Sequence, residues 1–350
     1  MITAIDLGYS TVKILQLTSS SSGYTILNSG SKSVTDNLKG FEPEKIKKAN
    51  WVATIQDLTK EMGINPKKVK KLITSISGHG VSVKQVSTME MSEDEMINSL
   101  EFEARKHIPL DGSEPVIDFH MLGQDKKELD KSNVLLVSTT KNIIMNHHDI
   151  IKEAGFKPDV FDTDTIALTN CYMHNSGFSN SGVDVILQMG AMYTTLIIWG
   201  ENQKFFTREL PIAGHHITKA IMKSQNLNYE EAEKLKFEKG VDSLTVSTSQ
   251  SDDTNGIKVD QQTILNSFCD ELRKTLRYYM KSNPQVKFNS FHFCGGSSNM
   301  IGLKDFIFST LKIELNQINP FEKITLNQTV DSPEIFAIAA GMALRGSSEE

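Results

Sequence analysis

A carboxylate, a short polar turn and a lysine follow one another near the start of the chain. These candidate phosphate-binding residues are Asp6, Gly8, Tyr9, Ser10, Thr11 and Lys13. Gly8 tolerates the positive φ of a tight turn, and the amides of the turn can form an anion-binding nest. Lys13 supplies a cation for the β- and γ-phosphates of a nucleotide, and Asp6 can hold Mg²⁺ through water. Taken alone, the pattern fits equally well a plain hairpin with a surface lysine.

Two later segments place glycine at the end of an apolar strand. The first repeats the order of strand, glycine turn and strand, and its candidate residues are Gln188, Gly190, Ala191 and Thr194. The second is an apolar strand at 290–293, and the loop after it contains the candidates Gly295, Gly296, Ser297 and Asn299. Paired glycines let the backbone approach a flat base and a ribose closely. An ordinary strand-to-helix turn often contains such a pair, so each segment alone is a weak signal.

These segments require a scaffold of strands and helices. Strands are predicted at 2–7, 12–17, 24–28, 69–77, 115–122, 134–138, 157–162, 183–189, 194–199, 202–209 and 290–293. Helices are predicted at 50–62, 92–108, 141–154, 163–172, 214–225, 229–238, 260–281 and 332–344. The hairpin that opens the chain recurs after a Ser/Gly/Asn-rich linker at 176–182, which predicts two α/β domains facing each other across a cleft. A Ser/Thr/Asp-rich stretch at 246–256 is predicted to be a mobile loop.

The helix that begins at Ser92 has the strongest local signals. Ser92 and Glu95 form a capping box, and Pro109 ends the helix. The residues predicted to share its buried face are Ile97, Leu100, Ala104 and Ile108.

Composition limits the possible classes of function. The formal net charge is −6 without a basic block, so nucleic-acid binding is not expected, because it needs clustered Lys and Arg. The three cysteines are far apart and form no CxxC pair, which favours a reducing compartment over a disulfide framework or a zinc site. The sequence shows no signal peptide and no apolar run of the roughly 20 residues that span a bilayer. We therefore expect a soluble protein without direct membrane insertion.

The three glycine-containing segments, in this order and at these separations, resemble the actin superfamily, which includes actin, the seventy-kilodalton heat-shock chaperones and the sugar kinases. In that ribonuclease H-like fold they are phosphate 1, phosphate 2 and the adenosine motif. The helices at 163–170 and 332–344 resemble its two connecting helices, whose small residues suit a close crossing. The resemblance implies an α/β, actin-like, two-domain fold. Its predicted parts are domain 1 at 1–180, domain 2 at 181–350 with subdomain 2B at about 212–288, and a final helix at 332–344 that returns toward domain 1.

Longer stretches narrow the resemblance. They run from Glu95 to Pro109, Glu114 to Phe119, Phe206 to Gly214, Glu231 to Lys236 and Ala340 to Arg345. Together they are similar to the PilM family of type IV pilus assembly proteins over nearly the whole chain, with the cell-division protein FtsA as a more distant relative. The resemblance implies an inserted subdomain, called 1C, at about 81–158, and bound ATP or ADP with Mg²⁺. It places Glu233 and Lys236 near the ribose and base, and Gly214 at the nucleotide.

The resemblance also implies partners and a location. PilM-like proteins bind the N-terminal cytoplasmic tail of PilN, a protein that spans the membrane once, in a groove that involves subdomain 1C. Such recognition uses extended backbone and apolar anchors, so the helix at 92–108 and the strand at 116–119 are candidate surfaces, with ordinary core packing as the alternative. The implied role is a cytoplasmic scaffold, peripheral to the inner membrane through its partner. Other platform proteins of the pilus machine are further expected partners, and self-association is possible.

One position departs from the family pattern. Phosphate 2 normally has an acid where this chain has Gln188, and a neutral amide neither adds charge to a Mg²⁺ site nor serves as a base for water. Asp164 lies where chaperone relatives carry a water-positioning acid, and it is the candidate catalytic residue. Asp162 and Asp164 could instead cap the helix that follows. We therefore predict nucleotide binding with little or no hydrolysis.

Two other functions remain open on this fold. A sugar kinase would need a general base for the acceptor hydroxyl, and no convincing acid in a loop suggests one. An FtsA-like filament-forming membrane tether would need a C-terminal amphipathic helix, which the sequence does not show. Fold alone decides between none of these.

Overall fold

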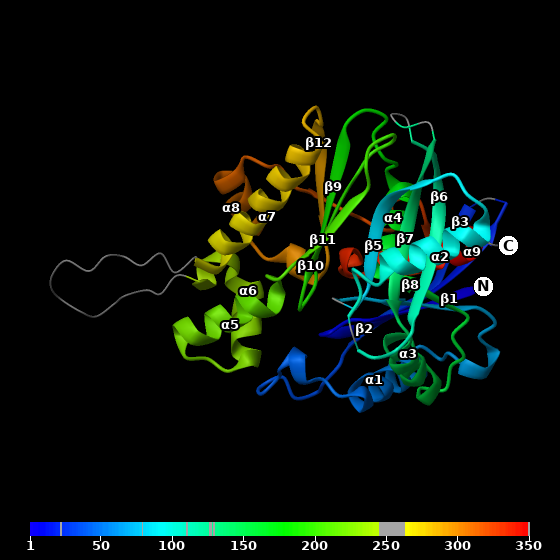
Figure 1. Ribbon diagram of the computed structural model, residues 1–350. Coiled ribbons are helices and arrows are strands. Elements are labelled where there is room, and N and C mark those ends of the chain that lie inside the picture. The colour runs from blue at the N-terminus through cyan, green and yellow to red at the C-terminus, as the bar shows by residue number, and fades with distance from the viewer. Residues whose placement is uncertain are drawn as a thin grey trace, which may run out of the picture.

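The strands of the described residues form three sheets in the computed structural model (Figure 1), which describes residues 1–21, 23–78, 80–109, 111–125, 128, 130–244 and 263–348. The six-stranded sheet has the order β14 (Thr325–Leu326), β3 (Gly23–Ser33), β2 (Thr11–Ser20), β1 (Ile2–Leu7), β4 (Leu72–Ile76) and β8 (Val160–Thr163). The five-stranded sheet has the order β11 (Phe206–Leu210), β10 (Thr194–Trp199), β9 (Val183–Met189), β12 (Phe288–Cys294) and β13 (Asn316–Gln317). The three-stranded sheet has the order β5 (Ser82–Met89), β7 (Lys131–Thr140) and β6 (Pro115–Gln124). The loop predicted at 246–256 lies outside the described residues.

Helices cover both faces of the two larger sheets. Two of them, α4 (Asp164–Asn175) and α9 (Ala337–Ser348), pack between these sheets. The outer face of the six-stranded sheet is covered by α1 (Lys48–Glu61) and α3 (Lys141–Glu153). The outer side of the five-stranded sheet is covered by α5 (Gly214–Gln225), α6 (Tyr229–Lys239), α7 (Thr263–Ser282) and α8 (Leu303–Leu311). Within the described ranges, no helix is both long and apolar enough to cross a membrane.

The alternation of side chains along β1 explains this layering. Ile2 and Ala4 pack in the cluster that contains α4 and α9, whereas Ile5 and Leu7 pack in the cluster that contains α1 and α3. Successive side chains of a strand point to opposite faces, so an apolar strand without alternation needs helices on both sides. The hairpin of β1 and β2 is thereby fixed in the centre of its half of the molecule. The predicted linker at 176–182 connects α4 to β9, while the domain limits themselves stay predictions.

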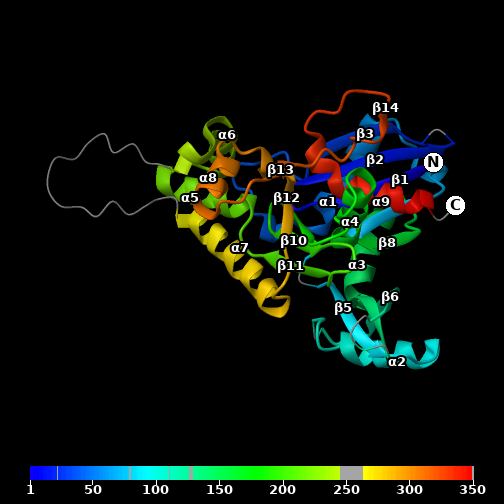
Figure 2. The ribbon, with the colours of Figure 1, turned by 90° about the horizontal axis from the view of Figure 1, so that it is seen from above.

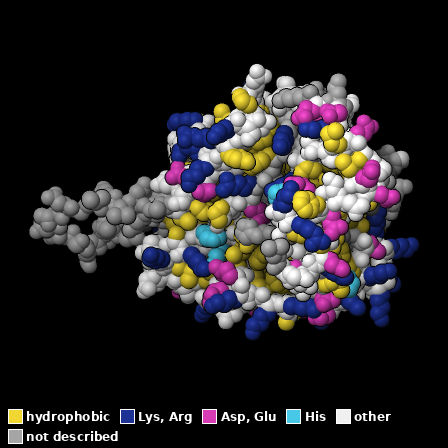
Figure 3. Space-filling model, in the orientation of Figure 1, with side chains coloured by type: hydrophobic (Ala, Val, Ile, Leu, Met, Phe, Trp, Pro, Cys, Tyr) yellow, Lys and Arg dark blue, Asp and Glu magenta, His cyan; other side chains and the backbone are white. Residues whose placement is uncertain are grey.

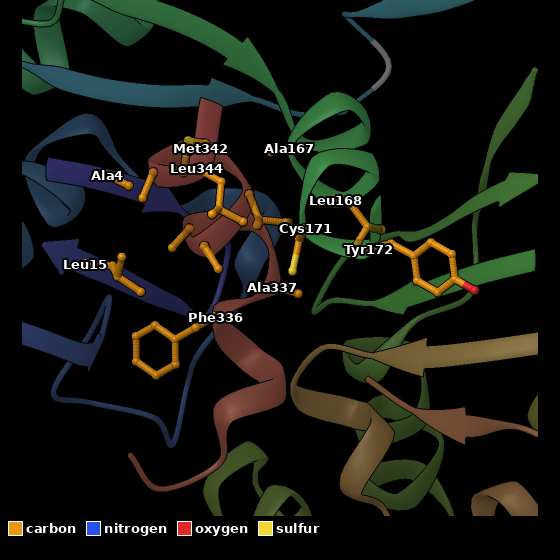
Figure 4. Close-up of a cluster of buried hydrophobic side chains, with 14 of the residues drawn as sticks. Ala4, Leu15, Ala167, Leu168, Cys171, Tyr172, Phe336, Ala337, Met342 and Leu344 are labelled. Carbon is orange, nitrogen blue, oxygen red and sulfur yellow. The ribbon is translucent and has the colours of Figure 1, made fainter. Parts of the chain in front are cut away.

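Helices α4 and α9 pack against each other through small residues such as Ala167 and Ala337, as their composition predicts (Figure 4). A Cβ atom on Gly341 would lie 1.7 Å from the carbonyl oxygen of Ala167, which no larger residue could tolerate without displacing a helix. Arg345, near the end of α9, forms an ion pair of 3.0 Å with Asp162. The helix predicted at 332–344 begins later than expected, because Pro333–Phe336 forms a 3₁₀ turn before α9.

The three-stranded sheet and α2 (Glu93–Ala104) project away from the two larger sheets (Figure 2). The capping box of Ser92 and Glu95 is confirmed. The predicted buried face of α2 is confirmed at Leu100 and Ala104 and wrong at Ile97, which is 40% exposed, whereas Met96 is 5% exposed and packs on β7. Spacing by four residues joins Met96 to Leu100 and Ala104, and the α-helix ends at Ala104, before Ile108. Helix α3 does not belong to this projection, since its apolar face packs beside α1.

Candidate functional site

A cavity of about 360 Å³ opens between the two halves of the molecule, and all three glycine-containing segments reach it. The predicted site residues that line it are Asp6, Gly8, Tyr9, Ser10, Thr11, Lys13, Asp164, Gln188, Gly190, Ala191, Gly214, Glu233, Lys236, Gly295, Gly296 and Ser297. Two predicted residues, Thr194 and Asn299, do not line it. The fold thus brings together side chains that are remote in sequence.

Asp6 and Lys13 face each other close to the turn of the first hairpin. They are paired residues of β1 and β2, so their side chains lie on the same face of the sheet. The Nζ atom of Lys13 lies 3.0 Å from Oδ2 of Asp6, and both side chains are largely buried. A charged pair in a region of low dielectric is sensitive to any third charge nearby. An anion in the cavity would therefore meet the ammonium group of Lys13, which the ion pair with Asp6 holds in position.

The turn of the first hairpin is fixed by aromatic residues. The indole nitrogen of Trp51 donates a hydrogen bond of 3.1 Å to the carbonyl oxygen of Gly8. The ring of Tyr9 meets the ring of Trp51 edge-on, and burial raises the pKa of Tyr9 to about 12. The positive φ expected at Gly8 is not found. Glycine is needed there for a close approach instead, because a Cβ atom would lie 2.6 Å from the carbonyl oxygen of Thr11.

The second hairpin is anchored to the first turn of α5. The amide of Gly214 donates to the carbonyl oxygen of Gly190 at 3.0 Å, and the amide of His215 donates to that of Ala191 at 2.9 Å. The position of Thr194 does not support its predicted contact, because the Thr194 hydroxyl is buried and donates to the carbonyl oxygen of Ile212 at 2.7 Å. Alternation along β10 turns the next residue, Thr195, to the cavity instead.

The third segment brings backbone close to backbone. Gly295 has a φ of +91°, and a Cβ atom there would lie 2.6 Å from the carbonyl oxygen of Met189, so this position requires glycine. Ser297 touches α5, since a Cβ atom on Gly214 would lie 2.1 Å from the Ser297 hydroxyl oxygen. Asn299 is exposed, and its amide nitrogen donates to the carboxylate of Glu334 away from the cavity. Its predicted contact with a nucleotide is therefore not supported by its position.

One wall of the cavity is a buried lysine and its partner acid on α6. Lys236 is only 1% exposed, and its Nζ atom lies 2.7 Å from Glu233 and 3.0 Å from the hydroxyl oxygen of Thr218. Burial lowers the pKa of Lys236, because the charged form loses its hydration, while Glu233 opposes that shift. Glu233 also accepts a hydrogen bond from the Thr218 hydroxyl. These contacts hold the predicted ribose-side residues in one arrangement.

Asp164 stands at the start of α4 and does not cap it. Thr163 is the N-cap, and its hydroxyl accepts a hydrogen bond of 3.2 Å from the amide of Ile166. Asp164 instead accepts a hydrogen bond of 2.5 Å from the hydroxyl of Ser75. Burial, followed by repulsion from Asp6, raises the pKa of Asp164 to about 7, and the Ser75 hydrogen bond opposes that shift. The alternative that Asp162 or Asp164 caps α4 is therefore wrong. The Asp164 side chain lines the cavity instead.

Sequence reasoning missed one acid of this cavity, Glu209. It lines the cavity from β11, and its Oε1 atom accepts a hydrogen bond of 3.2 Å from the amide of Gly78. The segment that contains Glu209 contributed to the family resemblance, but no role was predicted for its side chain. The alternation of β11 against β10 could have indicated it. Tyr193, His215 and Tyr229 are further lining residues that were not predicted.

The chemistry of these groups suits a nucleotide with a hydrated cation. The turns of the two hairpins present backbone near Lys13. The acids of the wall and the amide of Gln188 offer oxygen atoms, which Mg²⁺ prefers as ligands. Over the part of the chain that the structure describes, no three His, Cys, Asp or Glu side chains are grouped closely enough to hold a metal ion by themselves.

Comparisons with known proteins agree with this architecture. A family model described as type IV pilus assembly protein PilM matches residues 4–347. A chain in the solved PilM-PilN type IV pilus biogenesis complex is similar with a TM-score of 0.79 and 22% identity, over 99% of this chain and 98% of that chain. EutJ, an ethanolamine utilization protein from Carboxydothermus hydrogenoformans, has a TM-score of 0.52 and 11% identity, over 98% and 88%. MreB5 of Spiroplasma citri, solved with bound ADP, has a TM-score of 0.50 and 11% identity, over 99% and 96%.

These likenesses confirm the predicted actin-like α/β fold. At sequence identities this low, the similar structures establish only the fold. The assignment of the three-stranded projection as subdomain 1C stays a prediction. The family match is of a different kind, because it covers nearly every residue of the chain. The protein therefore belongs to the PilM family of type IV pilus assembly proteins.

Proposed function

We propose that this protein is a cytoplasmic, nucleotide-binding scaffold of a type IV pilus platform at the inner membrane. The observation that carries the proposal is the convergence of three glycine-containing segments on one cavity, in a chain that matches the PilM family from residue 4 to residue 347. Family membership supports this role over a sugar kinase or an FtsA-like tether. Contacts with other platform proteins and self-association stay predictions.

ATP or ADP is the proposed ligand of the cavity. The turns at 8–11 and 190–193 would cradle the phosphates, with Lys13 as their cation, and the glycine pair at 295–296 would face the adenosine. Glu233 and Lys236 would contact the ribose and base. When bound, Mg²⁺ would neutralise phosphate charge, and Asp6 would hold it through water. Because Gln188 is neutral, we expect hydrolysis to be slow.

The proposed partner is the N-terminal cytoplasmic tail of a PilN-like protein that spans the membrane once. The solved relative is a PilM-PilN complex, and hydrophobic side chains are exposed on the three-stranded projection of this chain. Phe102 on α2 is 70% exposed, and Met121 on β6 is 43% exposed. Hydrophobic side chains are interspersed with charged ones on the face that carries α2 (Figure 3), as a surface that recognises a short peptide requires. Binding of this tail would hold the protein at the membrane without insertion.

Binding of a labelled tail peptide, measured by fluorescence anisotropy with and without Mg-ATP, tests the partner directly. The peptide would be the N-terminal cytoplasmic tail of the PilN-like protein from the same genome. Phe102→Ala should weaken binding at least tenfold, since exposed aromatic anchors dominate such contacts. Phe308→Ala is the matched control, because Phe308 is 51% exposed on the remote helix α8. A wild-type protein that binds no such peptide under either condition would refute the partner.

A further inference from the structure

Glu209 belongs to a row of polar side chains that crosses three strands. Thr195 pairs with Gln188 of β9 on one side and with Glu209 of β11 on the other. Residues paired directly in antiparallel strands point to the same face, and all three line the cavity. Neighbouring strands lie about 4.8 Å apart, so Glu209 starts roughly 10 Å from Gln188 along this row. A carboxylate is thus present on the face where the amide of Gln188 replaces the usual acid.

The surroundings of Glu209 place it beside the other ionisable groups of the cavity. Its charge contributes to the raised pKa of Tyr9 and of Asp164, so the three side chains are close enough to interact. The amide of Gly78, which follows β4 in the other half of the molecule, donates to Oε1 of Glu209 at 3.2 Å. This contact orients the carboxylate across the cleft. Asp164 likewise accepts a hydrogen bond, from the Ser75 hydroxyl at 2.5 Å.

Glu209 also stands where a second cavity meets the first. This second cavity has a volume of about 210 Å³, and Ser77, Asp164 and Glu209 line both cavities. Its other walls come from residues 76–78, 81–84, His107, 163–165 and 207–208. None of these residues belongs to the predicted adenosine segment. Water can therefore approach Glu209 from a side that a bound adenosine would leave open.

We propose that Glu209 is a catalytic residue, the general base for the water that attacks the terminal phosphate of ATP; this rests on the proposed nucleotide binding. The water oxygen bonds to the γ-phosphorus, and the bond from that phosphorus to the oxygen bridging the β-phosphate breaks. ADP leaves with the bridging oxygen, and inorganic phosphate is the other product. The proton of the water passes to the Glu209 carboxylate and then to solvent. The slow hydrolysis that we expect then depends on Glu209 of β11 rather than on an acid at position 188 in phosphate 2.

The test is the rate of phosphate release with saturating Mg-ATP, with the affinity for a fluorescent ATP analogue measured in parallel. General bases contribute roughly 10²–10⁴-fold to a rate, so Glu209→Gln should lower hydrolysis at least tenfold. Its nucleotide affinity should stay within threefold of wild type. Glu201→Gln is the matched control, because Glu201 is an exposed acid in the turn after β10. That variant should hydrolyse ATP at the wild-type rate.

A second variant separates a base from a structural support. Adding Gln188→Asp to Glu209→Gln returns an acid to the same row, and we expect it to restore part of the lost rate. The proposal is overturned if the Glu209→Gln protein hydrolyses ATP at the wild-type rate. It is also overturned if that protein loses nucleotide affinity together with rate, and Gln188→Asp restores neither. A wild-type protein that binds ATP yet releases no phosphate would overturn it as well. If the wild type binds no nucleotide at all, the proposed function itself fails.

Discussion

Glu44 reaches from one half of the molecule to the other, and its Oε1 atom lies 3.1 Å from Nε2 of His215 on α5. The same oxygen accepts a hydrogen bond of 2.6 Å from Lys219, one turn further along that helix. Burial opposes ionisation of Glu44, but the hydrogen bond from Lys219, a backbone hydrogen bond and the charges of His215 and Lys219 together outweigh burial and lower the pKa of Glu44 to about 2. The carboxylate is therefore charged at neutral pH. The contact ties the segment at 34–47 to the wall of the cavity between the two halves, because His215 lines that cavity.

The remaining contacts of this segment strengthen the connection. The rings of Phe41 and Tyr229 meet edge-on with centroids 5.2 Å apart, and the amide of Tyr229 donates to the carbonyl oxygen of Lys39 at 3.3 Å. Leu38 and Tyr229 both line the cavity. Opening the cleft at this side would break these contacts together. Residues 34–47 therefore form a strap beside the site.

We expect Glu44→Ala to speed the release of a fluorescent ADP analogue. The ion pair is partly exposed, so its loss is worth about 1 kcal/mol, or roughly a fivefold faster release. Stopped-flow displacement by excess ADP measures this rate. Glu42→Ala serves as the control. Among the ion pairs of the described residues, Glu42 forms one with Lys45 of the same segment and none with the other half of the molecule. Equal release rates for the wild type and Glu44→Ala would show that the strap does not retain nucleotide.

The crossing of α4 and α9 should not tolerate a side chain at Gly341. Gly341→Ala would place a methyl group 1.7 Å from the carbonyl oxygen of Ala167, and overpacking of this kind costs about 1–3 kcal/mol. The free energy of unfolding in urea should fall by that amount or more. Gly40→Ala should change it little, because a Cβ atom at Gly40 meets open space. A Gly341→Ala protein as stable as wild type would mean that the two helices are not in close contact.

Acid should destabilise the protein through His147. Burial lowers the pKa of His147 from about 6.5 to about 4, and its Nε2 atom lies 2.7 Å from the hydroxyl oxygen of Thr74. Above pH 6.5 the ring is neutral in both folded and unfolded chains. Between pH 6.5 and pH 4 the unfolded chain binds a proton that the folded protein refuses, so stability falls as the pH falls through this window.

Thermal melting between pH 7 and pH 4.5 measures this effect. His147→Gln removes the titrating ring, and its melting temperature should fall less steeply with acid than that of wild type. His148→Gln keeps His147 and should retain the steep dependence, which controls for changes in α3. Parallel curves for the wild type and His147→Gln would contradict a neutral, buried ring at position 147.

Much of the framework was predictable because its signals are local. The hairpins of β1–β2 and β9–β10 combine apolar runs with a glycine turn, and their predicted ranges agree with the structure within a few residues. The cap at Ser92 was predictable for the same reason. Less was visible where neighbouring residues compete for one face. On α2, Met96 and Ile97 are both apolar, and only packing against β7 decides which of them is buried.

The site shows the same division between local and tertiary information. The glycine turns and Lys13 could be found from the sequence, because a few adjacent residues determine a tight turn. The orientation of Thr194 and Asn299 could not, since each finds a hydrogen-bond partner away from the cavity only in the folded protein. Glu209 was missed because its place in the cavity depends on the pairing of β11 with β10.

Calorimetric titration with Mg-ATP and Mg-ADP tests the central claim most directly, that the cavity between the two halves binds a nucleotide. We expect heat of binding for both nucleotides, and at least tenfold weaker binding for Lys13→Met, which removes the cation of the first hairpin. Lys32→Met, which removes a lysine on β3 of the same sheet that pairs with Glu61 of α1, should bind as wild type does. If neither nucleotide gives heat, and denaturation of the purified protein releases no bound nucleotide, the account is wrong.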